Sequence, residues 1–308
     1  MLSFKDPELA DRSWAALLLA AEPALSLEYC FASVYLWRKI YAQRIARFGD
    51  RLLVRVEGSL GPAYLYPAGS GPLAPALDAM GEDAAAQNVP LLLVCVTEEQ
   101  KAAVEAACPG RFEFEAHRDS FDYLYDVDRL ADLPGKKLHA KRNHISHFDA
   151  RFPDWTSEPV TAANVGECME LERQWNLLHL AEERREIAAG EDTISEESAV
   201  LMDALKHMDE LGMEGVLLRA EGEPVAFSLG GLITPECFDV NFEKSFGDVQ
   251  GAYAAVNREM ARRVRQVHPG VKWLNREDDM GLGGLRKAKL SYYPDILLTK
   301  YVAREVRP

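Results

Sequence analysis

The sequence lacks the local signatures of several common catalytic sites. Its 308 residues contain no GxSxG nucleophile elbow, no GxxxxGK[ST] phosphate loop, no GxGxxG turn and no HExxH pair. Each of these patterns places its reacting groups through a fixed short spacing on a strand, turn or helix. Their absence argues against a serine hydrolase of the elbow type, a P-loop nucleotidase, a dinucleotide-binding dehydrogenase and a zinc protease.

Cysteine is scarce and scattered, which argues against a disulfide framework and against a thiolate metal site. The five cysteines are odd in number, and none forms a CxxC pair; they are Cys30, Cys95, Cys108, Cys168 and Cys237. Three histidines, His139, His144 and His147, have helical spacing but no neighbouring set of acidic or cysteine ligands. We therefore expect reduced thiols and no metal cofactor.

Long hydrophobic runs are also missing. The apolar stretch 14–21 ends at Glu22-Pro23 and is far too short to span a bilayer. Positive charge is outnumbered, because 35 Lys and Arg face 49 Asp and Glu and give a net charge of −14. This excess argues against broad binding to nucleic acid or anionic membranes. We expect a soluble, cytoplasmic protein without an integral membrane segment.

What the sequence does contain is enough apolar residues, 48%, for sizeable cores in two domains. Two similar halves are recognisable from hydrophobic periodicity and turn residues. In the first half, strands are predicted at 51–56, 63–66, 91–96 and 123–127, with helices at 74–87 and 98–107 after the N-cap Thr97. In the second, strands are predicted at 214–219, 226–233, 238–243, 271–274 and 296–302, with a helix at 252–267. The alternation predicts an α+β fold built from α/β layers.

A basic segment separates the two halves. We divide the chain into an N-terminal domain, 1–132, a connector helix, 133–153, and a C-terminal domain, 154–308. The connector has one apolar face and otherwise carries cations, with a single acid, Asp149. It is either a solvated linker or a basic wall that faces an anionic ligand. In the second interpretation the groove is lined by Lys137, Lys141, Arg142 and His144.

The most informative stretch runs from 237 to 293: a strand, a glycine-bearing loop, a helix, a strand and a second glycine-rich turn. A loop that feeds a helix leaves backbone N–H groups unpaired, and these favour phosphate. We expect this loop to hold a carrier phosphate through Gly247, Gln250, Gly251, Ala252 and Tyr253. Neutralising and polar side chains are expected from Lys244, Asn275, Arg276, Arg286, Lys287 and Lys289.

Two side chains in this stretch are candidates for acid–base chemistry. Glu243 is the predicted general base, acting directly or through a water, and Tyr292 is the predicted acid. Backbone N–H groups of a splayed strand would polarise the reacting carbonyl. The alternatives are an ordinary strand-end ion pair between Glu243 and Lys244, and a plain turn at 281–284. In the first half, acids follow the loop 69–71 and would repel phosphate, so that domain is predicted to be structural or acceptor-binding.

Several blocks resemble one bacterial family, which is related to the C-terminal, catalytic domain of phosphatidylglycerol lysyltransferase. The similar blocks are 31–37, 133–138 with 141–144, 242–244, 251–253 with Asn257, 275–278, and 284–292. The resemblance covers nearly the whole chain. It implies a tandem GNAT fold, in which two acyltransferase-like domains each form a mixed twisted sheet flanked by helices.

The resemblance also implies an activity. We expect an acyl- or aminoacyltransferase that moves an acyl group from a phosphate-bearing carrier to an amine or hydroxyl. The donor would be aminoacyl-tRNA, bound at its acceptor end, or acyl-CoA such as acetyl-CoA. The acceptor would be a small molecule, a peptide or a lipid headgroup. The alternatives are an acetyl-CoA-dependent N-acetyltransferase and a noncatalytic GNAT-fold protein that binds a ligand. The sequence leaves the acceptor and the oligomeric state open.

Overall fold

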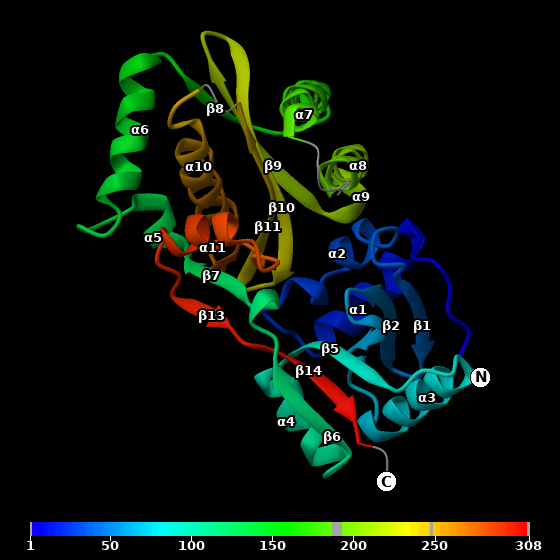
Figure 1. The fold of residues 1–308 in the computed structure, drawn as a ribbon. Helices are drawn as coiled ribbons and strands as arrows, with labels where there is room; N and C mark the ends of the chain where they lie inside the picture. Colours follow the sequence, from blue (N-terminus) through cyan, green and yellow to red (C-terminus); the bar gives the residue numbers. More distant parts are fainter. Residues whose placement is uncertain (1, 187–192, 247–248, 307–308) are drawn as a thin grey trace. The chain divides into compact units, whose positions relative to one another are not determined.

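The computed structural model describes residues 2–186, 193–246 and 249–306 (Figure 1). The chain forms two compact units, and both are discontinuous in sequence. The first comprises Met1–Leu124, Glu277–Lys289 and Ile296–Pro308; the second comprises Tyr125–Arg276 and Leu290–Asp295. The division expected from the sequence was contiguous, whereas the chain returns to each unit after leaving it.

The first unit is built on a mixed sheet with the order β1-β2-β3-β5-β14-β6. Its strands are β1 (Arg44–Phe48), β2 (Arg51–Gly58), β3 (Gly61–Leu65), β5 (Leu92–Thr97), β6 (Phe112–Ala116) and β14 (Lys300–Glu305), and the short β4 (Ala68–Gly69) pairs with β2. The pair β3–β5 is parallel, and the other pairs are antiparallel. A parallel pair needs a crossover connection, which α3 (Leu73–Ala86) supplies.

Three further helices of this unit are α1 (Arg12–Ala21), α2 (Phe31–Leu36) and α4 (Glu98–Ala107), and most of α11 (Gly283–Leu290) also belongs to it. Short 3-10 turns occur at Leu9–Asp11, Leu27–Tyr29 and Arg118–Ser120. At the start of α4 the Thr97 side chain accepts from the Gln100 N–H, and the Gln100 side chain accepts from the Thr97 N–H. This capping box confirms the predicted N-cap, because both groups satisfy otherwise unpaired helix donors.

The second sheet has the order β13-β7-β12-β11-β10-β9-β8. Its strands are β7 (Asp122–Asp126), β8 (Thr156–Pro159), β9 (Met213–Ala220), β10 (Glu223–Thr234), β11 (Cys237–Ser245), β12 (Trp273–Asn275) and β13 (Ile296–Leu298). Strands β9 to β11 form an antiparallel meander, β8 pairs antiparallel with β9, and β11 pairs with β12 in parallel. The crossover between β11 and β12 is α10 (Ala252–Val267), the helix predicted at 252–267.

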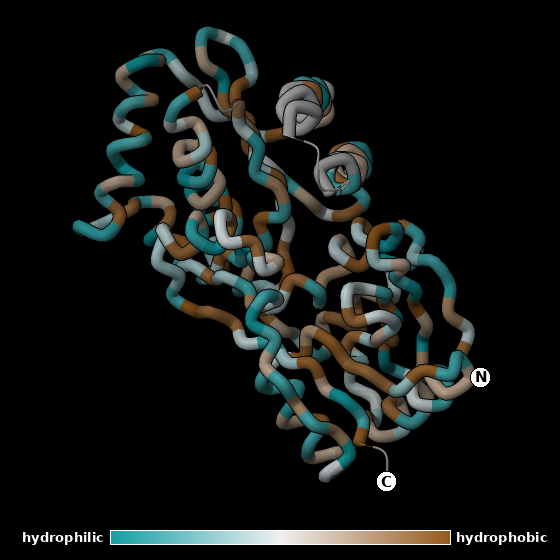
Figure 2. Tube along the Cα trace, viewed as in Figure 1, coloured by the Kyte–Doolittle hydropathy of each residue, from teal (hydrophilic) through white to brown (hydrophobic). Residues whose placement is uncertain are grey.

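Helices lie on both faces of this sheet within the second unit. Figure 1 shows α10 and α6 (His139–Arg151) on one side, and α7 (Val165–Glu186) and α8 (Thr193–Lys206) on the other. The unit also contains α5 (Val127–Asp132) and α9 (Met208–Leu211). α10 buries its apolar stripe, including Val256, Met260 and Val264, as the 3.6-residue period predicts. α6 is coloured mainly as hydrophilic in Figure 2.

Two strands lie in a different sheet from the one expected. We assigned 123–127 to the first half, but β7 pairs with β13 in the second sheet. We assigned 296–302 to the second half, and β13 does lie in the second sheet, but β14 inserts between β5 and β6 of the first sheet. The first assignment was wrong and the second held only for β13, because an apolar run indicates a strand without indicating its partner.

None of the helices within residues 2–186, 193–246 and 249–306 combines the length and hydrophobicity that a bilayer-spanning segment needs.

Candidate functional site

The chemistry of the second unit gathers where two parallel strands separate. β11 and β12 pair from Cys237 opposite Trp273 to Asp239 opposite Asn275. β11 then continues to its end at Ser245, whereas β12 has already ended. A register shift in the β10–β11 ladder also places a β-bulge at Asn241. Ligands commonly bind at the carboxyl ends of parallel strands, and bulges often redirect groups toward such sites.

A buried ion pair spans this point of separation. Arg276, which follows β12, donates from Nε to Glu243 Oε2 on β11 at 3.0 Å and also donates from Nη2. Both side chains are only 6% exposed. Burial disfavours the guanidinium charge, but the carboxylate of Glu243 outweighs it and raises the pKa of Arg276. The site therefore keeps a permanent positive charge.

α10 contributes two further contacts to the Glu243 carboxylate. Asn257 Nδ2 donates to Oε1 at 2.8 Å, and the Tyr253 hydroxyl lies 3.5 Å from Oε2. Although the Tyr253 side chain is 43% exposed, burial around its hydroxyl and the nearby carboxylate raise its pKa. A carboxylate with this many donors is well suited to hold Arg276 in place, and it has little capacity left to accept a substrate proton.

Aromatic rings enclose the guanidinium. The Arg276 Cζ lies 4.8 Å from the ring centre of Tyr292 and 5.8 Å from that of Tyr125. The two rings meet edge to face with centroids 6.4 Å apart. Tyr292 is 4% exposed, and burial raises its pKa to about 12. Its hydroxyl is therefore protonated at neutral pH, as a proton donor must be.

One lysine from α6 joins this cluster. The Lys141 Nζ lies 3.9 Å from the ring centre of Tyr292. Burial, together with the charge of Arg276, lowers the pKa of Lys141. Two cations and a neutral phenol thus meet beside one anchored carboxylate. This arrangement can bind a phosphate or carbonyl oxygen and can donate a proton to a leaving group.

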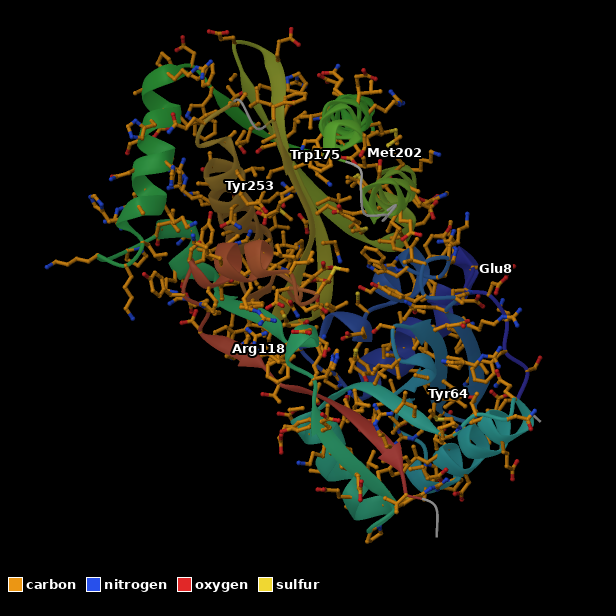
Figure 3. The ribbon with its side chains drawn as sticks, viewed as in Figure 1. Glu8, Tyr64, Arg118, Trp175, Met202 and Tyr253 are labelled. Atoms are coloured by element: carbon orange, nitrogen blue, oxygen red, sulfur yellow. The ribbon has the colours of Figure 1, made fainter. Side chains whose placement is uncertain are left out.

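Lys244 points to the opposite face of the sheet from Glu243, because successive strand residues alternate. Its Nζ lies 3.2 Å from Glu197 and 4.1 Å from the ring centre of Trp175. Figure 3 labels Trp175 and Tyr253 on the two sides of the sheet. Lys244 is therefore not part of the Glu243 cluster. The alternative of a Glu243–Lys244 strand-end pair is wrong too, because Glu243 pairs with Arg276.

The glycine-bearing loop is more enclosed than the sequence suggested. Gly247 lies outside the described residues, and Gln250 is exposed. Gly251 has φ +88°, and a Cβ there would lie 2.1 Å from the carbonyl oxygen of His144 on α6. Ala252 is fully buried, and its N–H already donates to Val249 O at 3.1 Å. The start of α10 thus packs on α6. A glycine in the sequence indicates that a close contact can form, but it does not indicate which segment makes that contact.

The four residues of the predicted basic groove do not act together. Lys141 reaches the cluster, but Arg142 donates to the carbonyl oxygens of Leu133 and Gly135, at 2.8 Å to the latter. Arg142 therefore holds the loop before α6. Lys137 and His144 are exposed, and Lys137 Nζ lies 5.4 Å from the ring centre of Tyr293.

The three cations of the last glycine-rich segment belong to the first unit. Arg286 donates to both oxygens of the buried Asp279, at 2.9 and 2.7 Å, and to Asp119 at 2.7 Å. Burial opposes the charge of Asp279, but the donors, led by Arg286, lower its pKa. Lys289 donates to the carbonyl oxygen of Asp278, and Lys287 is exposed. Arg286 and Lys289 thus stabilise the loop that contains Asp278 and Asp279. The turn at 281–284, for which a plain turn was one interpretation, leads into α11.

Sequence reasoning gave one residue of these clusters a different role and missed others. Asn275 was expected to contact the ligand and is fully buried on β12. Tyr125 was not singled out, although it lies beside Arg276. In the first unit, the fully buried Lys300 contacts Asp122 at 2.7 Å and Glu28 at 2.8 Å. A lysine inside an apolar strand run is a signal that could have indicated this buried cluster.

Comparison with known proteins identifies the family and the fold of the chain. The sequence family described as "Phosphatidylglycerol lysyltransferase, C-terminal" matches residues 23–304. A crystal structure of a conserved protein of unknown function from Bacteroides thetaiotaomicron is 34% identical, covers 99% of this chain and 100% of its own, and has a TM-score of 0.90. The structure of L-PGS from Bacillus licheniformis is 13% identical, with a TM-score of 0.58 and coverage of 92% and 93%.

A curated relative, the uncharacterized protein MYCGA3080 of Mycoplasmoides gallisepticum, is 23% identical over 192 residues. The match covers 62% of this chain and 58% of that protein, which is less than two thirds of its length. The predicted α+β fold class is confirmed by the two mixed sheets and by the similar fold of the L-PGS structure. Because the family match extends over most of its length, the chain belongs to the phosphatidylglycerol lysyltransferase C-terminal family.

Proposed function

We propose that the chain is an acyl- or aminoacyltransferase that uses a phosphate-bearing carrier, either aminoacyl-tRNA or acyl-CoA, as its donor. The acceptor is an amine or hydroxyl on a small molecule, a peptide or a lipid headgroup. Membership of a transferase family supports this proposal. The observation that carries it is the Glu243–Arg276 pair beside Lys141, at the point where β11 and β12 separate. The reaction would take place in the cytoplasm, where both kinds of donor are found.

In this proposal each side chain of the cluster has a distinct task. Arg276 and Lys141 attract the carrier phosphate and stabilise negative charge on the donor carbonyl oxygen. The acceptor nitrogen or oxygen forms a bond to the carbonyl carbon while the ester or thioester bond breaks. Tyr292 gives its proton to the departing oxygen or sulfur and regains one from the acceptor. Glu243, predicted as the base, is better placed to position Arg276.

The two donors are distinguishable by how their binding depends on salt. Aminoacyl-tRNA would contact exposed lysines of α6 and the preceding loop through several phosphates, so its affinity would fall steeply as salt rises. Acyl-CoA carries few phosphates and would show a shallow dependence. Calorimetry with acetyl-CoA and with a non-hydrolysable aminoacyl-tRNA tests the proposal. If neither donor binds, carrier-based transfer is disproved.

Two double variants sharpen this measurement. Replacing Lys137 and Lys141 with Gln should reduce the salt slope for tRNA by about 1.5, as expected for two lost phosphate contacts. Arg142 is left intact because it holds the loop before α6. The matched control replaces Lys39 and Lys206, both exposed, and should leave the slope unchanged. An equal loss in the control would show that overall charge governs binding.

A second candidate function is a noncatalytic protein that binds a phosphorylated ligand. The Glu243 carboxylate already accepts hydrogen bonds from Asn257 and Arg276. The cluster can therefore hold an anion, but it offers no unoccupied carboxylate as a general base, which favours this second function. The two functions differ in the effect of Tyr292→Phe, which removes only the phenolic oxygen. A binding protein would retain its affinity and show no turnover in either form.

A further inference from the structure

Beside the candidate site, one turn of the second unit presents apolar side chains to solvent. Leu290 is 43% exposed and Tyr293 is 42% exposed. The Tyr293 N–H donates to Leu290 O at 2.9 Å, which closes the turn. The neighbouring Tyr292 points the other way and is buried under Lys141 and Arg276. The exposed turn is therefore continuous with the cluster described above.

The backbone of this turn is strained and held firmly. Tyr293 has φ +55°, a left-handed conformation that bulky side chains rarely adopt. Arg129 donates to the Tyr293 carbonyl oxygen and also pairs with Asp295 at 2.6 Å. Strain of this kind persists only where surrounding contacts impose it, and it is concentrated at functional positions. The contacts of Arg129 thus hold the backbone that carries the exposed Tyr293 ring.

Positive charge lies next to the exposed ring. Lys137 Nζ is 5.4 Å from the ring centre of Tyr293, and Lys136 precedes it in the same loop. Both lysines are exposed. Figure 3 shows nitrogen-tipped side chains standing out from α6 and from the loop before it. A chain with a net charge of −14 thus carries a local basic surface.

We propose that this turn and loop dock the second unit onto an anionic lipid bilayer. The docking surface consists of Lys136, Lys137, Leu290 and Tyr293. The lysines would contact lipid phosphates, while the leucine and the tyrosine ring enter the boundary between headgroups and acyl chains. The acidic remainder of the chain would be repelled, so that one orientation is favoured. Because Lys137 also lies in the loop that aminoacyl-tRNA would contact, tRNA and the bilayer would compete for this lysine.

The apolar half of the surface distinguishes a bilayer from RNA. An exposed tyrosine beside lysines suits either partner, since nucleic-acid bases stack on aromatic rings. Leu290 offers no ring for stacking and no hydrogen-bonding group for a base or a phosphate. An aliphatic side chain next to an aromatic and two lysines is instead the combination found where helices and turns meet a membrane surface.

Co-sedimentation with lipid vesicles tests the inference. The full chain is mixed with phosphatidylcholine vesicles, alone or containing phosphatidylserine or phosphatidylglycerol, at low and at physiological salt. We expect binding to both anionic compositions, weakened by salt, and none to phosphatidylcholine alone. One variant pair, Leu290→Gln with Tyr293→Asn, removes the apolar half; asparagine tolerates the left-handed backbone. The other, Lys136→Gln with Lys137→Gln, removes the charge.

Each variant pair should weaken vesicle binding roughly ten-fold or more. The control pair Lys39→Gln with Lys206→Gln loses the same charge elsewhere and should bind as the unaltered chain does. Circular dichroism confirms that each variant is folded. Equal loss in the control, equal binding to neutral vesicles, or binding to phosphatidylglycerol but not phosphatidylserine would overturn surface docking. So would binding to a short RNA duplex without any vesicle binding.

Discussion

Arg276 donates to the carboxylate of Glu243 from Nε, at 3.0 Å, and from Nη2, with both side chains 6% exposed. The pair joins Arg276, the residue that follows β12, to Glu243 near the end of β11. Burying two charges costs desolvation free energy, which is offset only when geometry and additional donors are favourable. Asn257 supplies such a donor. The pair therefore fixes the Arg276 guanidinium at the site, and it is sensitive to loss of either partner.

The first prediction concerns the stability of this pair. Glu243→Ala should lower the free energy of unfolding by about 3 kcal/mol, because it leaves a buried guanidinium without its counter-charge. Replacing Glu243 and Arg276 together with Met should recover much of that loss. Urea denaturation of Glu243→Met, Arg276→Met and the double variant measures the coupling. Additive losses would show that the two side chains do not depend on each other.

The second prediction separates steric clash from backbone strain at the start of α10. Gly251→Ala should lower the free energy of unfolding by more than about 3 kcal/mol, because the new Cβ meets a backbone carbonyl. Gly222 has nearly the same φ, +86°, but nothing lies within 4 Å of its Cβ position. Gly222→Ala should therefore cost only about 1–2 kcal/mol. Similar losses in both variants would contradict the close packing of α10 on α6.

The third prediction tests whether Arg286 has a structural role. Arg286→Gln removes two bonds to the buried Asp279 and should destabilise the chain by about 2 kcal/mol. The adjacent, exposed Lys287 is the matched control, and Lys287→Gln should change stability by less than about 0.5 kcal/mol. Thermal or urea unfolding measures both. If Arg286→Gln were as stable as the control, the original assignment of Arg286 to ligand binding would regain support.

The fourth prediction concerns pH. Burial raises the pKa of Asp278 to about 6, from an ordinary value of 3.8. The folded chain then holds this proton over a range in which the unfolded chain has lost it, so stability falls as pH rises through that range. Asp278→Asn removes the effect and keeps an oxygen that can accept from the Met280 N–H, as Asp278 Oδ1 does at 3.1 Å.

Urea unfolding of both forms across this range provides the measurement. Relative to the Asn variant, the unaltered chain should lose about 1–2 kcal/mol between about pH 4 and pH 6.5, allowing for partial solvent screening. Parallel curves for the two forms would show that Asp278 titrates as an ordinary carboxyl group.

Local sequence signals predicted local structure well. The apolar period located α10 at 252–267, and Thr97 was predicted as the N-cap of α4. These features depend on neighbours within one or two turns, which a sequence displays directly. Glu243, Arg276, Lys141 and Tyr292 were also singled out, although the sequence assigned them to separate tasks.

Contacts between distant segments could not be predicted in this way. The sequence predicted a strand at 296–302, but only the folded chain shows β14 between β5 and β6. Lys244 looked equivalent to its neighbour Glu243 until the strand register placed the two on opposite faces. Arg142 looked like part of a groove, yet its guanidinium donates to loop carbonyls. In each case the deciding partner is remote in sequence or is a backbone atom without a residue-type signal.

The most direct test of the central claim is acyl transfer to hydroxylamine, used as an amine acceptor, from labelled acetyl-CoA and from labelled aminoacyl-tRNA. Transfer above background is expected with at least one donor. Tyr292→Phe should reduce its rate roughly 100-fold, the usual contribution of a general acid, while donor affinity is retained. Lys206→Gln serves as the control. No transfer from either donor, or an undiminished rate in Tyr292→Phe, would contradict the account.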